Sequence, residues 1–223
     1  MKPYEQLGEA RTPNGSVLAL YRHDGAYLIR ADGVELMSTR RHLSEDRLAE
    51  VACVPLQSTP SARVLIGGLG LGFTLREALR VLPSDAEVVV AELLAEVIEW
   101  NANAEYDLSA DAMRDPRVRM VHDDVVNVLV VNPGGFDAIM LDTDNGPDGM
   151  LMSENARLYI AKGIVTTIAA LRPGGVIAYW SVEDDPRFAR ALQRAKLTVD
   201  TLRVRAHETS GPMHTLYVAR RKA

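Results

Sequence analysis

A glycine-rich run between residues 64 and 74 constrains the fold of this chain more than any other feature. Three apolar residues, Val64–Ile66, come first, and a helix-forming run, Leu75–Leu79, comes after the glycines. The glycines are Gly67, Gly68, Gly70 and Gly72. Glycine lets the backbone approach a ligand where a Cβ atom would collide, and a helix N-terminus presents free N–H groups. The run therefore predicts a strand, a tight turn and a helix that form a nucleotide-binding corner, with these four glycines as cofactor-binding residues.

A carboxylate follows at the place where such corners bind a ribose. Glu92 ends a second apolar strand, Val88–Ala91, and lies about 20 residues after Gly72. An acid there accepts hydrogen bonds from both ribose hydroxyls, and we expect it to be ionised and partly exposed. The alternative is a helix N-terminal charge favoured by the helix dipole. The first interpretation predicts an adenosine-type cofactor.

Strand and helix patterns alternate from residue 63 onward. Strands are predicted at 63–67, 87–91, 117–121, 136–141 and 175–180. Helices are predicted near 73–82, 93–104, 124–131, 154–171 and 186–195. This alternation implies a parallel sheet covered by helices on both faces. Two further strands, 198–205 and 215–219, have no helix between them, which indicates an antiparallel hairpin at the sheet edge.

The N-terminal part has a different pattern. Short apolar runs between residues 17 and 37 are separated by the turns Asp24-Gly25 and Asp32-Gly33, which are hairpin signals. Ser44 is predicted as the N-cap of a helix that follows. We therefore expect residues 1–55 to form a small β domain with a linking helix, and residues 56–223 to form the cofactor-binding domain.

Composition narrows the class of partner. The formal net charge is −5, which argues against a nucleic-acid surface. The single cysteine, Cys53, excludes an intrachain disulfide and fits a reducing cytoplasm; its apolar neighbours predict a buried structural thiol. No apolar run approaches the ~20 residues of a membrane span, and the N-terminus has no signal-peptide core. We expect a cytoplasmic protein with no membrane or nucleic-acid partner.

Acidic residues gather where the predicted strands end. Open α/β sheets bind ligands at the carboxyl ends of their strands, so these residues are candidates for the site. They are Glu92, Asp123, Asp124, Asp142 and Asp144. A rim of this charge favours a cationic ligand. No spaced partner of His122 suggests a metal site, and we expect none.

Two of these acidic segments have competing interpretations. Asp123 and Asp124 cap the next helix, accept a hydrogen bond from an adenine amino group, or do both. Asp142 and Asp144 begin a loop rich in Asp, Gly and Pro, 142–149, which is either a solvated turn or a functional loop. In the functional interpretation these two carboxylates hold a protonated amine and accept its proton as it becomes a nucleophile.

Several motifs resemble those of the spermidine synthase (polyamine aminopropyltransferase) family, within the class I S-adenosylmethionine-dependent transferases. Leu65–Gly72 stands where that family has I-G-G-G-D-G-G, and Phe136–Asp144 resembles its Y-D-V-I-I-V-D-S-S-D-P. Ala31–Met37 resembles a hairpin of its small N-terminal β domain. The resemblance implies a Rossmann-like fold, with a seven-stranded, mostly parallel sheet ending in an antiparallel hairpin. It also implies a homodimer, no metal, and S-adenosylmethionine or its decarboxylated form as co-substrate.

The resemblance further implies transfer of an aminopropyl or methyl group to a small nucleophile, such as a cationic amine. Glu92 matches the family's ribose acid, Asp124 the acid near the adenine, and Asp142 the first acid of the D-S-S-D motif. Two positions depart from the pattern: Gly70 replaces an aspartate, and Asn145 stands where the second acid is expected, one residue after Asp144. The alternatives are an S-adenosylmethionine-dependent methyltransferase proper, and a non-catalytic nucleoside-binding or dimerisation module.

The choice of donor depends on a carboxylate. Intact S-adenosylmethionine carries one, and an acidic rim repels it unless a basic group receives it. Arg40, Arg41 and His42 are candidates for that charge, and an acid-free Gly70 also relieves repulsion. From the sequence we therefore expect the intact donor to bind at least as well as the decarboxylated one.

Overall fold

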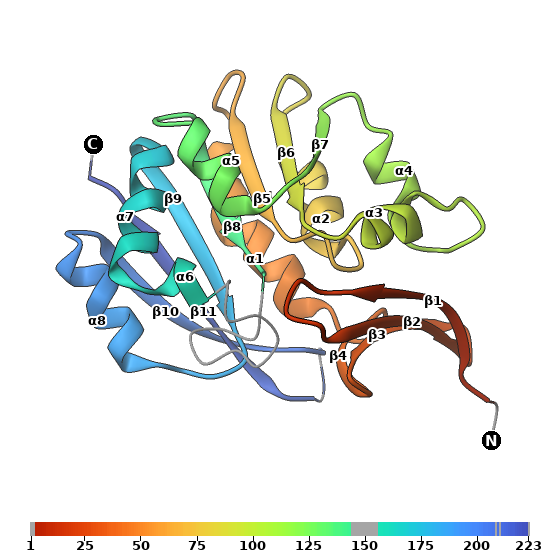
Figure 1. Ribbon diagram of the computed structural model, residues 1–223. Helices are drawn as coiled ribbons and strands as arrows, with labels where there is room; N and C mark the ends of the chain where they lie inside the picture. The colour runs from red at the N-terminus through yellow and green to blue at the C-terminus, as the bar shows by residue number, and fades with distance from the viewer. Residues whose placement is uncertain (1–2, 144–155, 208, 210, 223) are drawn as a thin grey trace.

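The computed structural model describes residues 3–143, 156–207, 209 and 211–222 and contains two sheets (Figure 1). The N-terminal sheet has four antiparallel strands in the order β1-β2-β3-β4. They are β1 (Glu5–Arg11), β2 (Val17–His23), β3 (Ala26–Ala31) and β4 (Val34–Ser38). Asp24, Gly25, Asp32 and Gly33 all have positive φ angles, as the tight turns of twisted hairpins require.

The first strand was not predicted. Its sequence is mostly polar, and Gly8 lies in its middle. Gly8 packs directly on the indole of Trp100, where a Cβ atom would collide with the ring. The side chain of Trp100, from α3 (Ala95–Ala102), thus covers the backbone of β1. The sequence near β1 does not predict this long-range contact.

The linking helix α1 (Leu43–Cys53) begins two residues earlier than predicted and runs into a short 3-10 helix, η1 (Val54–Leu56). The prediction of Ser44 as N-cap is wrong, because His42 occupies that position. Ser44 is instead fully buried in the first turn. Its hydroxyl contacts side chains of the candidate site rather than a free backbone N–H.

The large sheet has seven strands in the order β10-β11-β9-β8-β5-β6-β7. They are β5 (Arg63–Gly67), β6 (Glu87–Glu92), β7 (Val118–His122), β8 (Phe136–Leu141), β9 (Leu171–Ser181), β10 (Thr198–Arg205) and β11 (Met213–Arg220). Strands β5 to β9 pair in parallel, and β11 pairs antiparallel with both β9 and β10. This confirms the predicted parallel sheet with an antiparallel hairpin at its end.

Helices cover both faces of this sheet (Figure 1). Besides α1 and α3 they are α2 (Phe73–Val81), α4 (Ala110–Met113), α5 (Val125–Val131), α6 (Ala156–Tyr159), α7 (Ala161–Ala170) and α8 (Pro186–Arg194). Alternate side chains of β5 feed separate cores: Val64 and Ile66 pack with α1, α2 and the N-terminal sheet, and Leu65 packs with α5 and α7. The described part of the predicted helix 154–171 is two helices, because Ile160 separates α6 from α7.

The two sheets share one core. Leu20 and Ile29 of the N-terminal sheet belong to the same buried cluster as Ile66 and Val88 of the large sheet. Buried apolar contact therefore anchors the small sheet to the large one. The division at residue 55 falls within η1 and stays a prediction.

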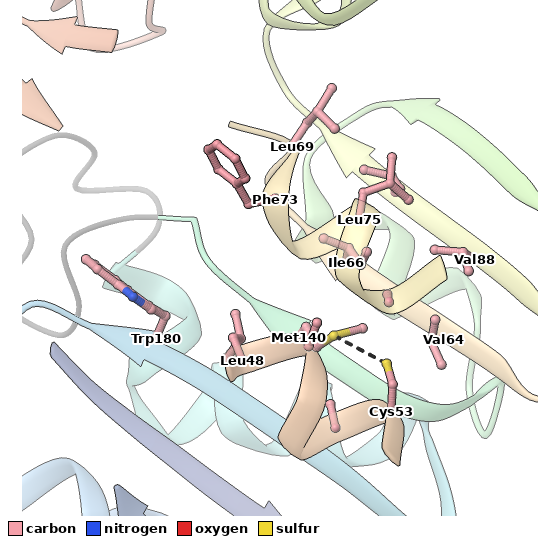
Figure 2. Close-up of a cluster of buried hydrophobic side chains, with 14 of the residues drawn as sticks. Leu48, Cys53, Val64, Ile66, Leu69, Phe73, Leu75, Val88, Met140 and Trp180 are labelled. Carbon is pink, nitrogen blue, oxygen red and sulfur yellow. Dashed lines mark hydrogen bonds between the residues drawn. The ribbon is translucent and has the colours of Figure 1, made fainter. Parts of the chain in front are cut away.

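Cys53 closes α1 inside this core (Figure 2). Its side chain is fully buried, and its sulfur lies 3.9 Å from that of Met140. Burial raises the pKa of the thiol to about 12, so it stays protonated and unreactive at neutral pH. The predicted structural role is confirmed. No helix of the described ranges is long and apolar enough to cross a membrane.

Candidate active site

A cavity of about 160 Å³ opens where the carboxyl ends of β5, β6 and β8 face the N-terminal sheet. That sheet contributes an apolar wall, made by Leu18, Ile29, Leu36 and Met37. The large sheet contributes polar groups from the ends of its strands, as expected for an open α/β sheet. The small sheet is therefore part of the site.

Five carboxyl side chains line the cavity. They are Glu45, Glu92, Asp123, Asp124 and Asp142. Among the cavity-lining residues that the structure describes, none is lysine, arginine or histidine. The undescribed segment 144–155 contains none of these residue types in its sequence either. The charge of the cavity thus favours cations.

The glycine loop brings backbone rather than side chains to the cavity. Gly68 and Gly70 line it, with φ angles of +87° and +53°. A Cβ on Gly68 would press against the carbonyl oxygen of Asp142, and one on Gly70 would lie 2.7 Å from the Met37 methyl group. Glycine is therefore required at both positions by close packing against Asp142 and Met37, which themselves line the cavity.

The other two glycines do not line the cavity. The missing Cβ of Gly67 faces the side chains of Leu141 and Val125, so this glycine serves strand packing. Gly72 is the N-cap of α2 with a φ of +80°, and it packs against Ser109. Their prediction as cofactor-binding residues stays untested, and the contacts described favour a structural role.

Glu92 joins the glycine loop to the rest of the site. Its Oε2 accepts a hydrogen bond from the Leu69 backbone N–H at 2.8 Å, and its Oε1 accepts one from Leu94 N–H at 2.9 Å. The expectation of a partly exposed acid is wrong, because Glu92 is only 8% exposed. Burial raises its pKa, and the backbone hydrogen bonds oppose that shift. Each oxygen keeps a further lone pair for a ligand hydroxyl.

Replacing Glu92 with glutamine is expected to weaken nucleoside binding by roughly 10- to 100-fold, the range for losing hydrogen bonds to a charged group. The amide keeps one acceptor oxygen and presents its NH₂ to a backbone N–H. Calorimetry with methylthioadenosine measures this effect. The control is Glu87→Gln, at the other end of β6, where Glu87 pairs with Arg63 at 2.8 Å. Equal binding by both variants would contradict a ligand role for Glu92.

Asp123 and Asp124 both line the cavity at the start of α5. Asp124 is the N-cap, and its Oδ1 accepts from the Val126 backbone N–H at 2.8 Å, while its Oδ2 pairs with Arg157. Asp123 Oδ1 accepts from the Asn127 side chain at 2.8 Å. The capping interpretation is confirmed for Asp124. The carboxylate of Asp123 is more available to a ligand than that of Asp124, because no ion pair of Asp123 is described.

Asp142 directly follows the last residue of β8 and borders the glycine loop. Its backbone N–H donates to the Gly67 carbonyl at 3.0 Å, which fixes the chain beside Gly68. Its side chain is partly exposed and lines the cavity, and desolvation raises its pKa to about 7. Asp144, the other predicted catalytic acid, lies outside the described residues.

Glu45 is a site residue that the sequence does not predict. It is 6% exposed in the first turn of α1, where an acid is ordinarily explained as a favourable helix-start charge. Desolvation, followed by the charge of Asp142, raises its pKa to about 8. A signal was present: Glu45, Leu48, Ala49 and Ala52 have the i, i+3, i+4, i+7 spacing of one helix face. Because the other residues of this face are apolar and pack against the core, an acid on the same face is expected to be buried.

The basic residues before α1 do not supply charge to the cavity. Arg40 contacts Asp24, Arg41 pairs with Glu35, and His42 lies 2.7 Å from Asp46 while stacking on Phe73. None of the three lines the cavity. The expectation that they receive a donor carboxylate is therefore wrong for the described arrangement.

A family model described as the spermine/spermidine synthase domain matches residues 48–195. The chain belongs to this family. Its relatives include the polyamine aminopropyltransferase of Mycobacterium tuberculosis strain H37Rv, 35% identical over 136 residues, which are 60% of this chain and 25% of the relative. That of Leptospira biflexa is 33% identical over 150 residues, 66% of this chain and 50% of the relative. The chain thus spans a quarter to a half of the length of these relatives.

The family likeness extends to a second named activity and to solved structures. Putrescine N-methyltransferase 1 of Nicotiana tabacum is 36% identical over 128 residues, 56% of this chain and 32% of that protein. Spermidine synthase from Thermotoga maritima superposes with a TM-score of 0.74 at 20% identity, and a spermidine synthase complex with the transition-state analogue AdoDATO with 0.73 at 19%. Each comparison covers 96% of this chain and 72% of the other. These structures confirm the predicted spermidine synthase-like fold.

Proposed function

We propose that this chain transfers an aminopropyl group from decarboxylated S-adenosylmethionine to a small amine. The single observation that carries this proposal is the charge of the cavity: five carboxyl side chains and, among its described lining residues, no basic one. The decarboxylated donor offers two positive charges, a sulfonium and an ammonium. The intact donor adds a carboxylate that these acids repel. This proposal differs from the expectation drawn from the sequence, in which the intact donor binds at least as well.

The described residues suit a nucleoside donor. Gly68 and Gly70 line the cavity with backbone, and Glu92 has lone pairs for ribose hydroxyls. We assign the hydrogen bond from an adenine amino group to Asp123 instead of Asp124, because both oxygens of Asp124 already have partners in Val126 and Arg157. The donor supplies a carbon already activated by positive sulfur, so the protein has mainly to bind, align and exclude water. The apolar wall from the N-terminal sheet serves that last purpose.

The acceptor needs a negative group beside the reacting carbon. Asp142 stands next to the glycine loop and lines the cavity, so we assign it the role of orienting the amine. The nucleophile must lose a proton before its lone pair attacks in line with the departing sulfur. Asp144 stays a predicted proton acceptor.

Methyl transfer is the second candidate. One observation favours it: a relative named putrescine N-methyltransferase has a percent identity close to that of the aminopropyltransferases, 36% against 35%, over a somewhat shorter stretch. Both reactions use the same nucleoside corner and the same acid-lined acceptor region. The difference lies in which carbon beside sulfur is aligned with the amine.

Mass spectrometry of reaction mixtures tests the proposal. The protein is incubated with putrescine and either donor, and we expect a product heavier by one aminopropyl group with the decarboxylated donor. Asp111→Asn, at a fully exposed position on α4, is expected to keep full activity. A methylated product from the intact donor would favour the second candidate. No product with either donor would overturn both, and would leave the non-catalytic nucleoside-binding module.

A further inference from the structure

Glu45 is a buried carboxyl group of the cavity to which the proposed function gives no individual role. It comes from α1, whereas the other acids of the cavity follow strands of the large sheet. Glu45 and Asp142 repel each other when both are ionised. Desolvation raises the pKa of Glu45 to about 8 and that of Asp142 to about 7. Two such acids share a proton near neutral pH instead of ionising together.

One oxygen of Glu45 is held in place by a chain of hydrogen bonds. Ser44 Oγ donates to Glu45 Oε2 and lies 2.9 Å from His214 Nδ1. A hydroxyl has one proton, so the second contact requires that Nδ1–H of the imidazole donates to Ser44. Burial and the charge of Arg41 lower the pKa of His214 to about 4, so the ring is neutral at pH 7 and this contact assigns its one proton to Nδ1. The orientation of Glu45 is therefore set from β11.

An independent observation points to a polar ligand beside this pair. Trp180, at the end of β9, lines the same cavity and is only 6% exposed (Figure 2). Its indole Nε1–H finds no acceptor among the described residues, and its ring meets His214 edge-on with centroids 4.5 Å apart. A buried donor without a partner is costly and is normally satisfied by a ligand or an ordered water. The face of an indole also attracts cations.

We propose that Glu45 and Asp142 together hold the acceptor amine as an ammonium, and that Glu45 accepts the proton which the nitrogen loses. This inference rests on the proposed function. The ammonium gives one proton to the carboxylate, and the freed lone pair forms the new N–C bond. The C–S bond breaks with its electron pair going to sulfur, so the sulfonium becomes a neutral thioether. The product nitrogen keeps one positive charge, as a secondary ammonium.

Calorimetry tests the pair without requiring turnover. Putrescine is titrated into protein saturated with methylthioadenosine at pH 7.5, in two buffers of different ionisation enthalpy. Because the ammonium displaces the shared proton, we expect release of roughly one proton per amine bound. Glu45→Gln is expected to bind at least about tenfold more weakly and to release far less. Glu50→Gln, on the same helix and paired with Arg47, is expected to match the wild type. Wild-type affinity and release in Glu45→Gln would overturn the pair.

The pH dependence of amine alkylation gives a second readout. The groups acting on Glu45 are Ser44, Asp142 and Asp46, with His214 behind Ser44. The hydroxyl of Ser44 favours the ionised carboxylate, so Ser44→Ala raises the pKa of Glu45. Because the ionised form is needed, the acid limb of the kcat/KM profile is expected to move to higher pH. An unchanged limb, or a shift to lower pH, would contradict the proposed role of Glu45.

The outcomes separate this inference from the proposed function. Wild-type protein that binds putrescine with proton release but forms no product would overturn the function and leave the acid pair intact. Product formation with Glu45→Gln as active as the wild type, and Asp144→Asn inactive, would overturn the role of Glu45 alone. The melting temperature checks folding. Glutamine removes a buried acid whose pKa is raised, so we expect Glu45→Gln to melt no lower than the wild type at pH 8.

Discussion

Replacing Asp142 with asparagine is expected to lower kcat/KM for amine alkylation by roughly 30- to 5,000-fold, because losing one partner of a buried charged hydrogen bond costs about 2 to 5 kcal/mol. Asparagine fills the same space, but it has no charge to hold an ammonium beside the glycine loop. Nucleoside binding should stay within a few-fold of the wild type, because the Asp142 backbone N–H still donates to the Gly67 carbonyl. Steady-state kinetics and calorimetry with methylthioadenosine measure the two effects separately.

Stability gives a check on the same variant. Desolvation raises the pKa of Asp142 from its ordinary 3.8 to about 7 in the folded protein. A raised carboxyl pKa favours folding at acid pH, and that stability is lost as the pH rises through about 7. Asp142→Asn should therefore melt higher than the wild type at pH 8. Loss of activity together with a lower melting temperature there would indicate a structural rather than a catalytic defect.

Replacing Gly68 with alanine is expected to destabilise the protein by about 2 to 5 kcal/mol, from the left-handed backbone and the added clash together. The φ of Gly68 is +87°, and the new methyl group would press on the carbonyl oxygen of Asp142. That oxygen belongs to the backbone and cannot swing away as a side chain would. Binding of methylthioadenosine should fall as well, because relief of the clash must shift Gly68 or Asp142, which both line the cavity.

Gly33→Ala is the matched control for this variant. Gly33 has nearly the same φ, +85°, but no atom lies within 4 Å of its would-be Cβ. It should show only the conformational penalty, about 1 to 2 kcal/mol. Urea unfolding of both variants isolates the contribution of the clash. Equal destabilisation would mean that close approach of the Gly68 backbone to Asp142 is not what demands glycine.

Much of the large sheet could be predicted because its strands are short apolar runs bounded by turn residues. The predicted strands 63–67 and 136–141 coincide with β5 and β8. β1 could not be predicted, because its polar sequence becomes a strand only when Trp100 covers Gly8. The predicted N-cap at Ser44 was wrong for a similar reason, since that hydroxyl is used by a distant histidine.

The candidate site also contains residues that could be predicted from local patterns and residues that depend on long-range packing. The rule that ligands bind at the carboxyl ends of parallel strands led to Gly68, Glu92 and Asp142, which all line the cavity. Glu45 follows no strand of that sheet, so its place in the cavity depends on how α1 packs against α2 and strands β8 and β9. The expectation that Arg40 and Arg41 receive a donor carboxylate was wrong, because their partners are acids outside the cavity. The predicted homodimer and cytoplasmic location stay predictions.

The central claim is that the acids of this cavity select a donor without a carboxylate. Calorimetric titration with decarboxylated and with intact S-adenosylmethionine, in the same buffer at low salt, tests it most directly. We expect the decarboxylated donor to bind at least about tenfold more tightly, since an added carboxylate meets like charges with little solvent between them. Equal or tighter binding of the intact donor would contradict the claim.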